Sequence, residues 1–507
     1  SVLLILLLYV LAFRNPAQAG LALSTVTAGA LGGSSLCFVI FGQVHFSVSV
    51  FGSALTGISA DYAVHSLAAR RAHLTSGGGT EPAVGNGLRR ALTIIMLTSA
   101  AGFAALLLFD IDVFRQIGVF AIGGLFLAWL FAIAVLPRLD RLGVARETGR
   151  LPLVRLARTV MHLPRRWLVF GTAVGLVVLV AIPGFLSATF VDDLRRFQVP
   201  AADLVADREA LLPVAAGQLA TGFLLSSGDD RQAALGQEEE FLARISVPSA
   251  EFVALSRFDP STVRRAHVRE AYASYLLGPH LLSMRAQLGF SRSDAPTLPS
   301  ANGPAMQPAW LAALEFQRQG RTFLMAPLLA SRSSVDPGTG DGSRLIDPVA
   351  TYSTALRDYR RTALQTFAAS AVFAALFLLL VYRRARALLL ILPPVAGCVL
   401  ALSMQALLGI PITLFSVLAL FIVLGTGIDF SVFQWEMRQD RTGWTGVAVV
   451  IAALSTCVAM GMLGFSDTLP VQSFGITIAI GVIGSMVFSF LLPISNQGAA
   501  TDNVLRS

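Results

Sequence analysis

Long apolar stretches separated by short polar connections dominate the chain. They cover residues 2–13, 19–41, 48–68, 91–109, 116–136 and 167–188, and, after a long polar region, 363–382, 387–408, 414–435, 445–465 and 474–492. All but the first are long enough to cross a bilayer as an α-helix, which takes about 20 residues. We interpret 2–13 as part of a helix that starts before Ser1. The pattern predicts a polytopic α-helical membrane protein.

The basic residues predict how these helices are oriented. The chain has 38 basic residues and all are Arg. They gather in alternate connections, at 70–71 and 89–90, 138–166, 383–386 and 438–441, whereas 110–115, 409–413 and 466–472 carry almost no excess positive charge. By the positive-inside rule the Arg-rich connections face the cytoplasm. We therefore expect a multi-pass membrane protein whose long polar region lies outside, in a periplasm or its equivalent.

This orientation divides the chain into six regions. We predict first-half transmembrane helices at 1–137, a cytoplasmic Arg-rich linker at 138–166, a helix that opens the second half at 167–188, a periplasmic α+β domain at 189–360, second-half helices at 361–494 and a cytoplasmic tail at 495–507. Within the periplasmic domain we expect a strand at 218–226, helices at 230–244, 261–288 and 306–320, and a loop at 331–343. Glu238, Glu239 and Glu240 are expected on the solvent face of their helix.

Composition excludes several classes of function. Hydrophobic residues make up 55% of the chain and charged residues 13%, so lipid is the solvent for most of it. The net charge is +8, but the Arg lie at helix ends and not in a cluster, which argues against a nucleic-acid partner. The three Cys fall in apolar stretches, with no disulfide or zinc spacing. The polar region has no enzyme motif, and His267 and His280 stand alone. We expect neither an enzyme nor a bound cofactor or metal.

Two carboxylates interrupt the apolar pattern. Asp61 lies inside 48–68 and Asp429 inside 414–435. An ionised carboxylate near the centre of a bilayer costs about 2.5–3.5 kcal/mol on insertion scales, so a chain that carries two usually needs them. Because neutralisation removes that cost, each can bind and release a proton. We predict a proton relay of Asp61, Tyr62 and Asp429.

Neighbouring polar residues are candidates to support this relay. They are His65, which follows Asp61 by one helical turn, and the hydroxyl residues Thr98, Ser99, Ser455 and Thr456. Two alternatives stay open: Ser and Thr in membrane helices often bond their own backbone, and His65 suits the membrane interface at a helix end.

An internal repeat relates the two aspartate stretches. Gly57-Ile58-Ser59-Ala60-Asp61-Tyr62-Ala63-Val64 corresponds to Gly425-Thr426-Gly427-Ile428-Asp429-Phe430-Ser431-Val432, and Leu97-Thr98-Ser99-Ala100 to Leu454-Ser455-Thr456-Cys457. Motif order and loop orientation match in both halves. This predicts two parallel pseudo-repeated helix bundles about an axis along the membrane normal, with the aspartate helices facing each other and Tyr62 opposite Phe430.

This organisation resembles the resistance-nodulation-division (RND) superfamily, in particular its MMPL branch. The resemblance rests on the parallel halves, the outer domain after the first helix of the second half, and the Gly-Ile-x-x-Asp-Tyr motif that ends at Tyr62. The second copy reads Asp429-Phe430 and departs from the doubled Asp-Tyr arrangement, so we expect Asp61 to carry more of the proton traffic. The family plan has a further helix and a first outer domain, which would precede Ser1. Residues 191–195 are similar to a stretch in predicted exporters of this branch, some of which accompany aryl-polyene pigment pathways.

The resemblance implies an exporter driven by the proton gradient. It would move a lipid-like or hydrophobic molecule, with an aryl-polyene pigment lipid as one candidate, from the inner membrane to the periplasm or outer envelope. Membrane lipids and envelope transport or biosynthetic proteins are the expected partners. Two other functions stay open: a protein-translocation auxiliary of the same superfamily, and a sterol- or lipid-sensing module that does not transport.

Overall fold

A computed structural model describes most of the chain. It covers residues 2–13, 16–44, 46–75, 86–108, 112–139, 166–197, 222–244, 252–276, 278–289, 309–328, 342–438, 440 and 442–492. The chain separates into two compact units. One comprises Ser1–Asp192, Arg196–Gln198 and Leu356–Ser507, and the other comprises Asp193–Arg195 and Val199–Ala355.

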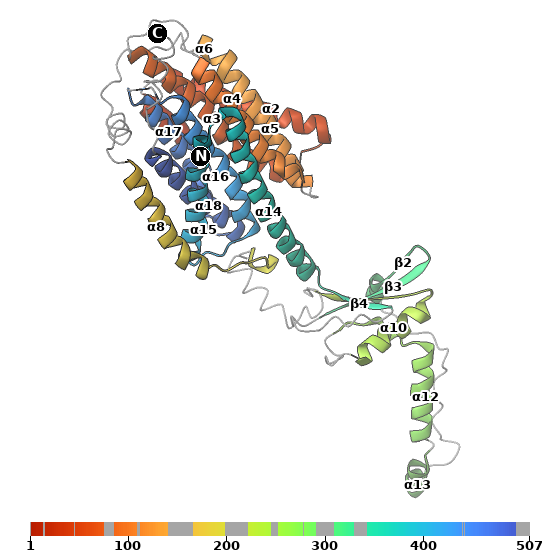
Figure 1. Ribbon diagram of the computed structural model, residues 1–507. Coiled ribbons are helices and arrows are strands. Elements are labelled where there is room, and N and C mark those ends of the chain that lie inside the picture. The colour runs from red at the N-terminus through yellow and green to blue at the C-terminus, as the bar shows by residue number, and fades with distance from the viewer. Residues whose placement is uncertain are drawn as a thin grey trace. The chain divides into compact units, whose positions relative to one another are not determined.

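The first unit is helical (Figure 1). Its α-helices are α1 (Val2–Phe13), α2 (Pro16–Phe41), α3 (Phe46–Thr75), α4 (Asn86–Ala104), α5 (Asp112–Ala134), α6 (Leu136–Leu139), α8 (Arg166–Leu186), α14 (Pro348–Tyr382), which starts before the unit boundary, α15 (Leu392–Leu407), α16 (Leu414–Glu436), α17 (Trp444–Ala459) and α18 (Leu469–Leu491). Its short 3-10 helices are η1 (Ala105–Leu108), η7 (Ala385–Ile391) and η8 (Gly461–Phe465), and η3 (Leu194–Phe197) contains residues of both units.

Most of these helices have the length and apolarity of membrane spans. Among the described residues, nine helical segments are long and apolar enough to cross a bilayer. The chain is therefore a polytopic helical membrane protein, as the apolar pattern predicts. Helix α3 has the length but not the apolarity, since it carries Asp61, His65, Arg70 and Arg71. Helix α14 starts at Pro348, well before the predicted 363, because about four polar helical turns precede its apolar part.

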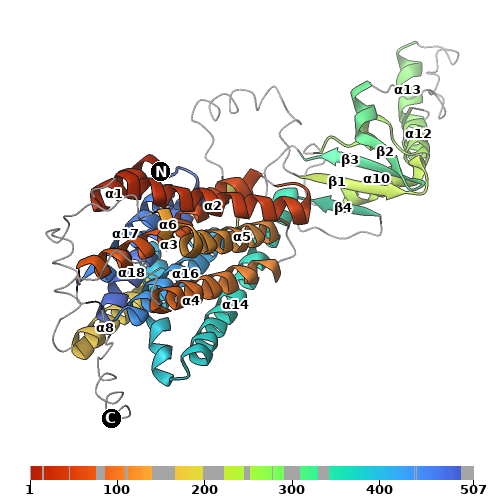
Figure 2. The ribbon, with the colours of Figure 1, turned by 90° about the horizontal axis from the view of Figure 1, so that it is seen from above.

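The helices pack in matching pairs. Helix α2 packs on α5 and α15 on α18, α3 on α5 and α16 on α18, and α4 on α5 and α17 on α18. Three further helix pairs join the two halves: α3 with α17, α16 with α4, and α1 with α17. Figure 2 shows α2 beside α5 when the molecule is seen from above.

Glycine permits the closest of these approaches. A Cβ at Gly32 would lie 2.8 Å from the carbonyl of Gly123, and one at Gly397 only 2.5 Å from the carbonyl of Gly481. A larger residue at either position would push the helices apart.

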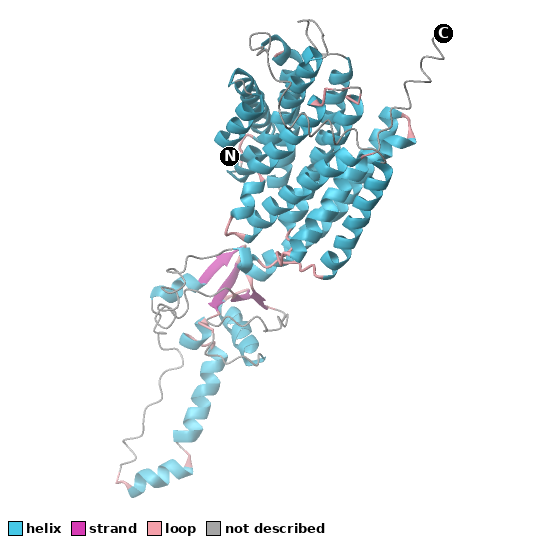
Figure 3. Ribbon diagram, turned by 90° about the vertical axis from the view of Figure 1, so that its left-hand side faces the viewer, coloured by secondary structure: helices cyan, strands magenta, loops and turns pink. Residues whose placement is uncertain are grey.

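The second unit holds a small antiparallel sheet (Figure 3). Its strands β1 (Phe223–Gly228), β2 (Glu315–Arg318), β3 (Arg321–Pro327) and β4 (Ser343–Ile346) lie in the order β2-β3-β1-β4. Its helices are α10 (Arg231–Arg244), α11 (Leu255–Phe258), α12 (Thr262–Leu276), α13 (Pro279–Gln287) and the 3-10 helix η6 (Ala309–Leu314). Buried Leu224 and Ala326 from the sheet pack with Phe241 of α10 and form the core.

Two sequence predictions for this unit are wrong. The described part of 306–320 is η6 followed by β2, not one helix, because Gln319 and Gly320 turn the chain back into β3 with φ of 51° and 76°. Positive φ at both central residues is the signature of a two-residue hairpin turn. Glu238 is also fully buried, not solvated: its carboxylate accepts the backbone N–H of Ser256 at 2.7 Å.

The other predicted elements of this unit are present in the part of the chain that the structure describes. Helix α10 occupies its predicted range, strand β1 extends two residues beyond the predicted end, and the predicted helical stretch 261–288 is divided into α12 and α13 before Pro279. Residues 218–221 of the predicted strand and 331–341 of the predicted loop lie outside the described residues, and Ser343 begins β4.

Candidate functional site

Asp61 lies on α3 and is held from the opposite half of the chain. Only 3% of the residue is exposed. Its Oδ1 accepts a hydrogen bond from the Ser455 hydroxyl of α17 at 3.3 Å. The same hydroxyl lies 2.8 Å from the Ala452 carbonyl, so its one proton is shared between two acceptors. No described residue bonds Oδ2 of Asp61.

Asp429 lies on α16 and is held in the reciprocal way. It is 1% exposed, and the Ser99 hydroxyl of α4 lies 3.1 Å from Oδ1 and 3.3 Å from Oδ2. A Cβ at Gly425, one turn earlier on α16, would lie 3.5 Å from the Ser99 hydroxyl, which is an ordinary van der Waals contact. Each aspartate thus takes a serine hydroxyl from the other half.

The two carboxylates belong to one electrostatic site. Asp61 and Asp429 interact electrostatically, and among the described residues neither forms an ion pair with a basic side chain. Two like charges in a low-dielectric interior repel each other strongly. This repulsion favours states in which at least one of the two carboxyl groups is protonated. No group of three or more metal-ligating side chains occurs in the described part of the chain.

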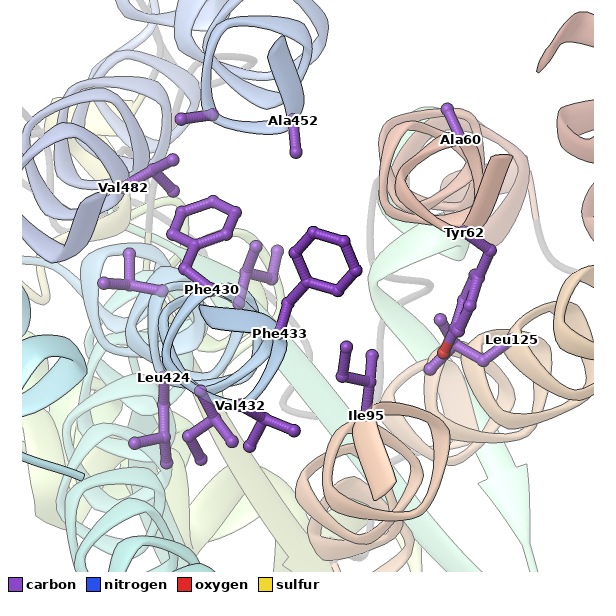
Figure 4. Packing of buried hydrophobic residues seen from close by; sticks show 14 of the residues in the cluster. Ala60, Tyr62, Ile95, Leu125, Leu424, Phe430, Val432, Phe433, Ala452 and Val482 are labelled. Atoms are coloured by element: carbon purple, nitrogen blue, oxygen red, sulfur yellow. The ribbon is translucent and has the colours of Figure 1, made fainter. Parts of the chain in front are cut away.

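Tyr62 is buried, but it does not lie opposite Phe430 as the repeat predicts. Tyr62 points from α3 toward Leu125 of α5, whereas Phe430 points from α16 toward Val482 of α18 (Figure 4). The Tyr62 side chain interacts electrostatically with both aspartates. Its hydroxyl has no hydrogen-bond partner among the described residues. It therefore belongs to the site without being bonded to either carboxylate.

His65 is buried in the protein interior. It is 1% exposed, α3 continues beyond it to Thr75, and its ring packs on Phe433 of α16 with centroids 4.0 Å apart. Neither ring nitrogen has a partner among the described residues. The aspartate helices therefore meet at His65 and Phe433, one turn beyond their carboxylates.

The four predicted hydroxyl residues divide into two groups. Ser99 and Ser455 donate hydrogen bonds to the carboxylates. The Thr98 hydroxyl donates to its own helix, at the carbonyls of Ile94 and Ile95. The buried Thr456 hydroxyl has no hydrogen-bond partner among the described residues.

Sequence reasoning missed Tyr9. This residue of α1 is 1% exposed and interacts electrostatically with Asp61 and Ser455. The signal was available, since Tyr9 carries the one side-chain hydroxyl in the apolar stretch 2–13. With Tyr9, hydroxyl groups approach Asp61 from two helices.

Comparisons with known proteins leave the family open. No protein-family model and no curated protein sequence matches this chain.

Proposed function

We propose that this protein is a proton-driven membrane transporter whose proton site is the Asp61–Asp429 pair. The reciprocal arrangement of two buried aspartates carries the proposal, since each accepts a serine hydroxyl from the other half. A buried polar group that is bonded across an interface holds that interface in one packing. Protonation of either carboxylate changes this bond, and so links proton binding to the packing of the halves.

The contact pattern supports two pseudo-equivalent bundles. The packing of α3 on α5 has its counterpart in α16 on α18, and that of α3 on α17 in α16 on α4. Rigid-body rocking of such bundles about a central site is a common form of alternating access. The arrangement supports membership of the RND superfamily, and of its MMPL branch, through Asp61-Tyr62.

A lipid-like or hydrophobic molecule is the substrate we propose. The resemblance to MMPL-type exporters supports export from the bacterial inner membrane to the periplasm or outer envelope, with an aryl-polyene pigment lipid as a candidate. The Arg-rich connections support the orientation in which the second unit is periplasmic. In this proposal the protein is not an enzyme, uses the proton gradient in place of a cofactor, and works beside envelope transport or biosynthetic proteins.

Replacement of each aspartate by Asn tests the proposal. Asp61→Asn and Asp429→Asn keep the size and one acceptor of the side chain but cannot cycle a proton. Both should abolish export and leave the protein folded in the membrane. Thr98→Ala is the matched control, because the Thr98 hydroxyl bonds only its own helix.

The measurement compares the lipids and pigments of outer-envelope extracts from cells that carry each variant. A deletion strain defines the molecule that is lost, and membrane levels of each variant confirm that it is folded. Retained export in both aspartate variants would refute proton-driven transport and would favour a sensing module.

A further inference from the structure

Unpaired polar atoms gather on α3 on one side of Asp61. Oδ2 of Asp61, the Tyr62 hydroxyl, both ring nitrogens of His65 and the Ser66 hydroxyl are buried without a hydrogen-bond partner among the described residues. They follow one another along six residues of one helix, toward its Arg-rich end at Arg70 and Arg71. Buried polar groups are nearly always bonded, to protein or to ordered water.

The equivalent positions of α16 have no polar side-chain atom that lacks a hydrogen-bond partner among the described residues. In the register that aligns Asp61 with Asp429, Phe433 corresponds to His65 and Gln434 to Ser66. Phe433 is fully buried and has no polar atom. The Gln434 amide is satisfied, since its Nε2 donates to the Ser489 hydroxyl at 2.9 Å. The second half offers no unpaired side-chain polar atom at these positions.

We propose, on the basis of the proton site above, that water bound by His65 and Ser66 connects Asp61 to the Arg-rich side of the membrane. The path is one-sided: it follows α3 and has no counterpart on α16. A site with several polar groups that lack partners binds water well, because each molecule gains two to four hydrogen bonds. His65 suits this role because a neutral imidazole donates from one nitrogen and accepts at the other.

Proton transfer along this path balances without any further reagent. Asp61 gives its proton to a bound water, and that water passes a proton to the accepting nitrogen of His65. The opposite nitrogen releases its own proton to the next water, so the imidazole ends neutral in its other tautomer. Asp61 is left ionised and one proton has moved toward the Arg-rich side.

At the Arg-rich end of the proposed path lies Arg71, whose guanidinium is held by neighbouring helices. Arg71 is 5% exposed; its guanidinium donates to the Gln18 side chain of α2 at 2.6 Å and lies over the Trp444 ring at 5.2 Å. Because an α-helix rises about 1.5 Å per residue, Arg71 lies roughly 9 Å beyond His65 along α3. On its own helix His65 thus lies between Asp61 and the pair Arg70 and Arg71, and Phe433 faces it from α16.

Hydrogen–deuterium exchange of the Asp61 carboxylic acid tests the path without a known substrate. The full-length protein, in phosphatidylethanolamine and phosphatidylglycerol vesicles, is moved from H2O to D2O at a pH where the acid form is present. Infrared difference spectra then follow the shift of the carboxyl C=O band, which Asp61→Asn assigns. His65→Phe keeps a ring against Phe433 but removes both nitrogens.

We expect His65→Phe to slow this exchange about tenfold or more, the change that corresponds to one lost buried hydrogen bond. His65→Gln should restore much of the rate, because an amide still bonds water, and it remains informative if His65→Phe does not fold. Gln434→Leu, at the position equivalent to Ser66, should leave the rate unchanged.

Two results would overturn the path. One is that the Asp61 acid exchanges as fast in His65→Phe and in Ser66→Ala as in the wild type. The other is that Gln434→Leu slows this exchange as much as His65→Phe does. Either leaves the proton site itself standing, since that site is judged by export in the aspartate variants.

Discussion

At the scale of single residues, serine hydroxyls decide how the membrane carboxylates are held. Ser99→Ala removes the hydroxyl that bonds Asp429, whereas Thr98→Ala removes a hydroxyl that bonds only the backbone of its own helix. A carboxyl group that loses a hydrogen bond to its oxygen absorbs at higher frequency. We predict that Ser99→Ala shifts the acid C=O band of Asp429 upward and that Thr98→Ala does not.

Infrared spectra of the two variants in lipid measure this difference, with Asp429→Asn to assign the band. An unshifted band in Ser99→Ala would mean that the Ser99 hydroxyl does not bond Asp429 in the membrane.

A second residue-scale prediction concerns pH and the second unit. Burial raises the pKa of the Glu238 carboxyl above its usual value, although the hydrogen bonds from Ser256 and Leu255 lower it. The folded state then holds the proton more tightly than the unfolded state. The stability that this protonation contributes is fully present below the unfolded pKa, and is lost as pH rises through the folded pKa.

Glu238→Gln should remove this part of the pH dependence, because an amide does not titrate. Amide exchange of β1 and α10 in the full-length protein measures it: the advantage of the wild type over Glu238→Gln should shrink as pH rises from about 4, near the ordinary Glu pKa, through the raised pKa of Glu238. Parallel pH profiles for the two proteins would contradict the assignment.

At the scale of elements, a buried ion pair ties the start of α14 to the chain that follows α8. The Arg360 guanidinium donates to both carboxylate oxygens of Asp192 at 2.8 Å and lies over the Phe190 ring at 4.4 Å. Residues 189–191 are fixed in turn, since Thr189 and Val191 exchange backbone hydrogen bonds with Ile412. Side-chain exposures of 11% and 8% make this a buried pair.

Breaking a buried pair leaves an uncompensated charge, which costs about 3–5 kcal/mol. We therefore predict that Arg360→Leu lowers the free energy of unfolding by about that amount. Arg357→Leu is the control: its side chain is 58% exposed and lies 4.0 Å from Asp192, so its loss should change stability by less than about 1 kcal/mol. Denaturant unfolding in micelles measures both, and equal stabilities would contradict the prediction.

The sequence predicts the bounds of the membrane helices well and those of elements outside the apolar stretches less well. Membrane helices such as α16 were predicted nearly to the residue, because the bilayer demands a long apolar helix wherever the chain crosses it. Helix α14 was predicted too short, since the turns before 363 are polar and hydropathy does not register them. Strand β2 was missed because the turn at Gln319-Gly320 depends on a positive φ at Gln319 that few sequence patterns signal.

In the candidate site, the sequence identifies the two aspartates but not the side chains that contact them. Both aspartates were recognisable because an ionisable group in an apolar stretch is rare. Which hydroxyl reaches them was not, because Ser99 and Thr98 are adjacent in sequence and only the packing of α4 on α16 selects Ser99. The burial of His65 depends likewise on α16, which contributes Phe433 from a distant part of the chain.

At the scale of the whole molecule, the last prediction concerns orientation in the membrane. Gln43 follows α2 and Arg384 follows α14, and both residues are exposed. The excess of Arg around Arg384 and its absence around Gln43 predict that the two lie on opposite sides of the membrane, with Arg384 in the cytoplasm. The orientation bears on the proposed proton path along α3: since that path runs toward the Arg-rich side, we expect it to open on the side where protons leave.

Single cysteines at these positions test the orientation once Cys37, Cys398 and Cys457 have been replaced by Ala. A membrane-impermeant maleimide should label Gln43→Cys in intact cells, and should label Arg384→Cys only after the membrane is permeabilised. Because both side chains are exposed, accessibility to the reagent reports the side of the membrane and not burial. Labelling of Arg384→Cys in intact cells would invert the topology, and the α3 path would then be an entrance for protons.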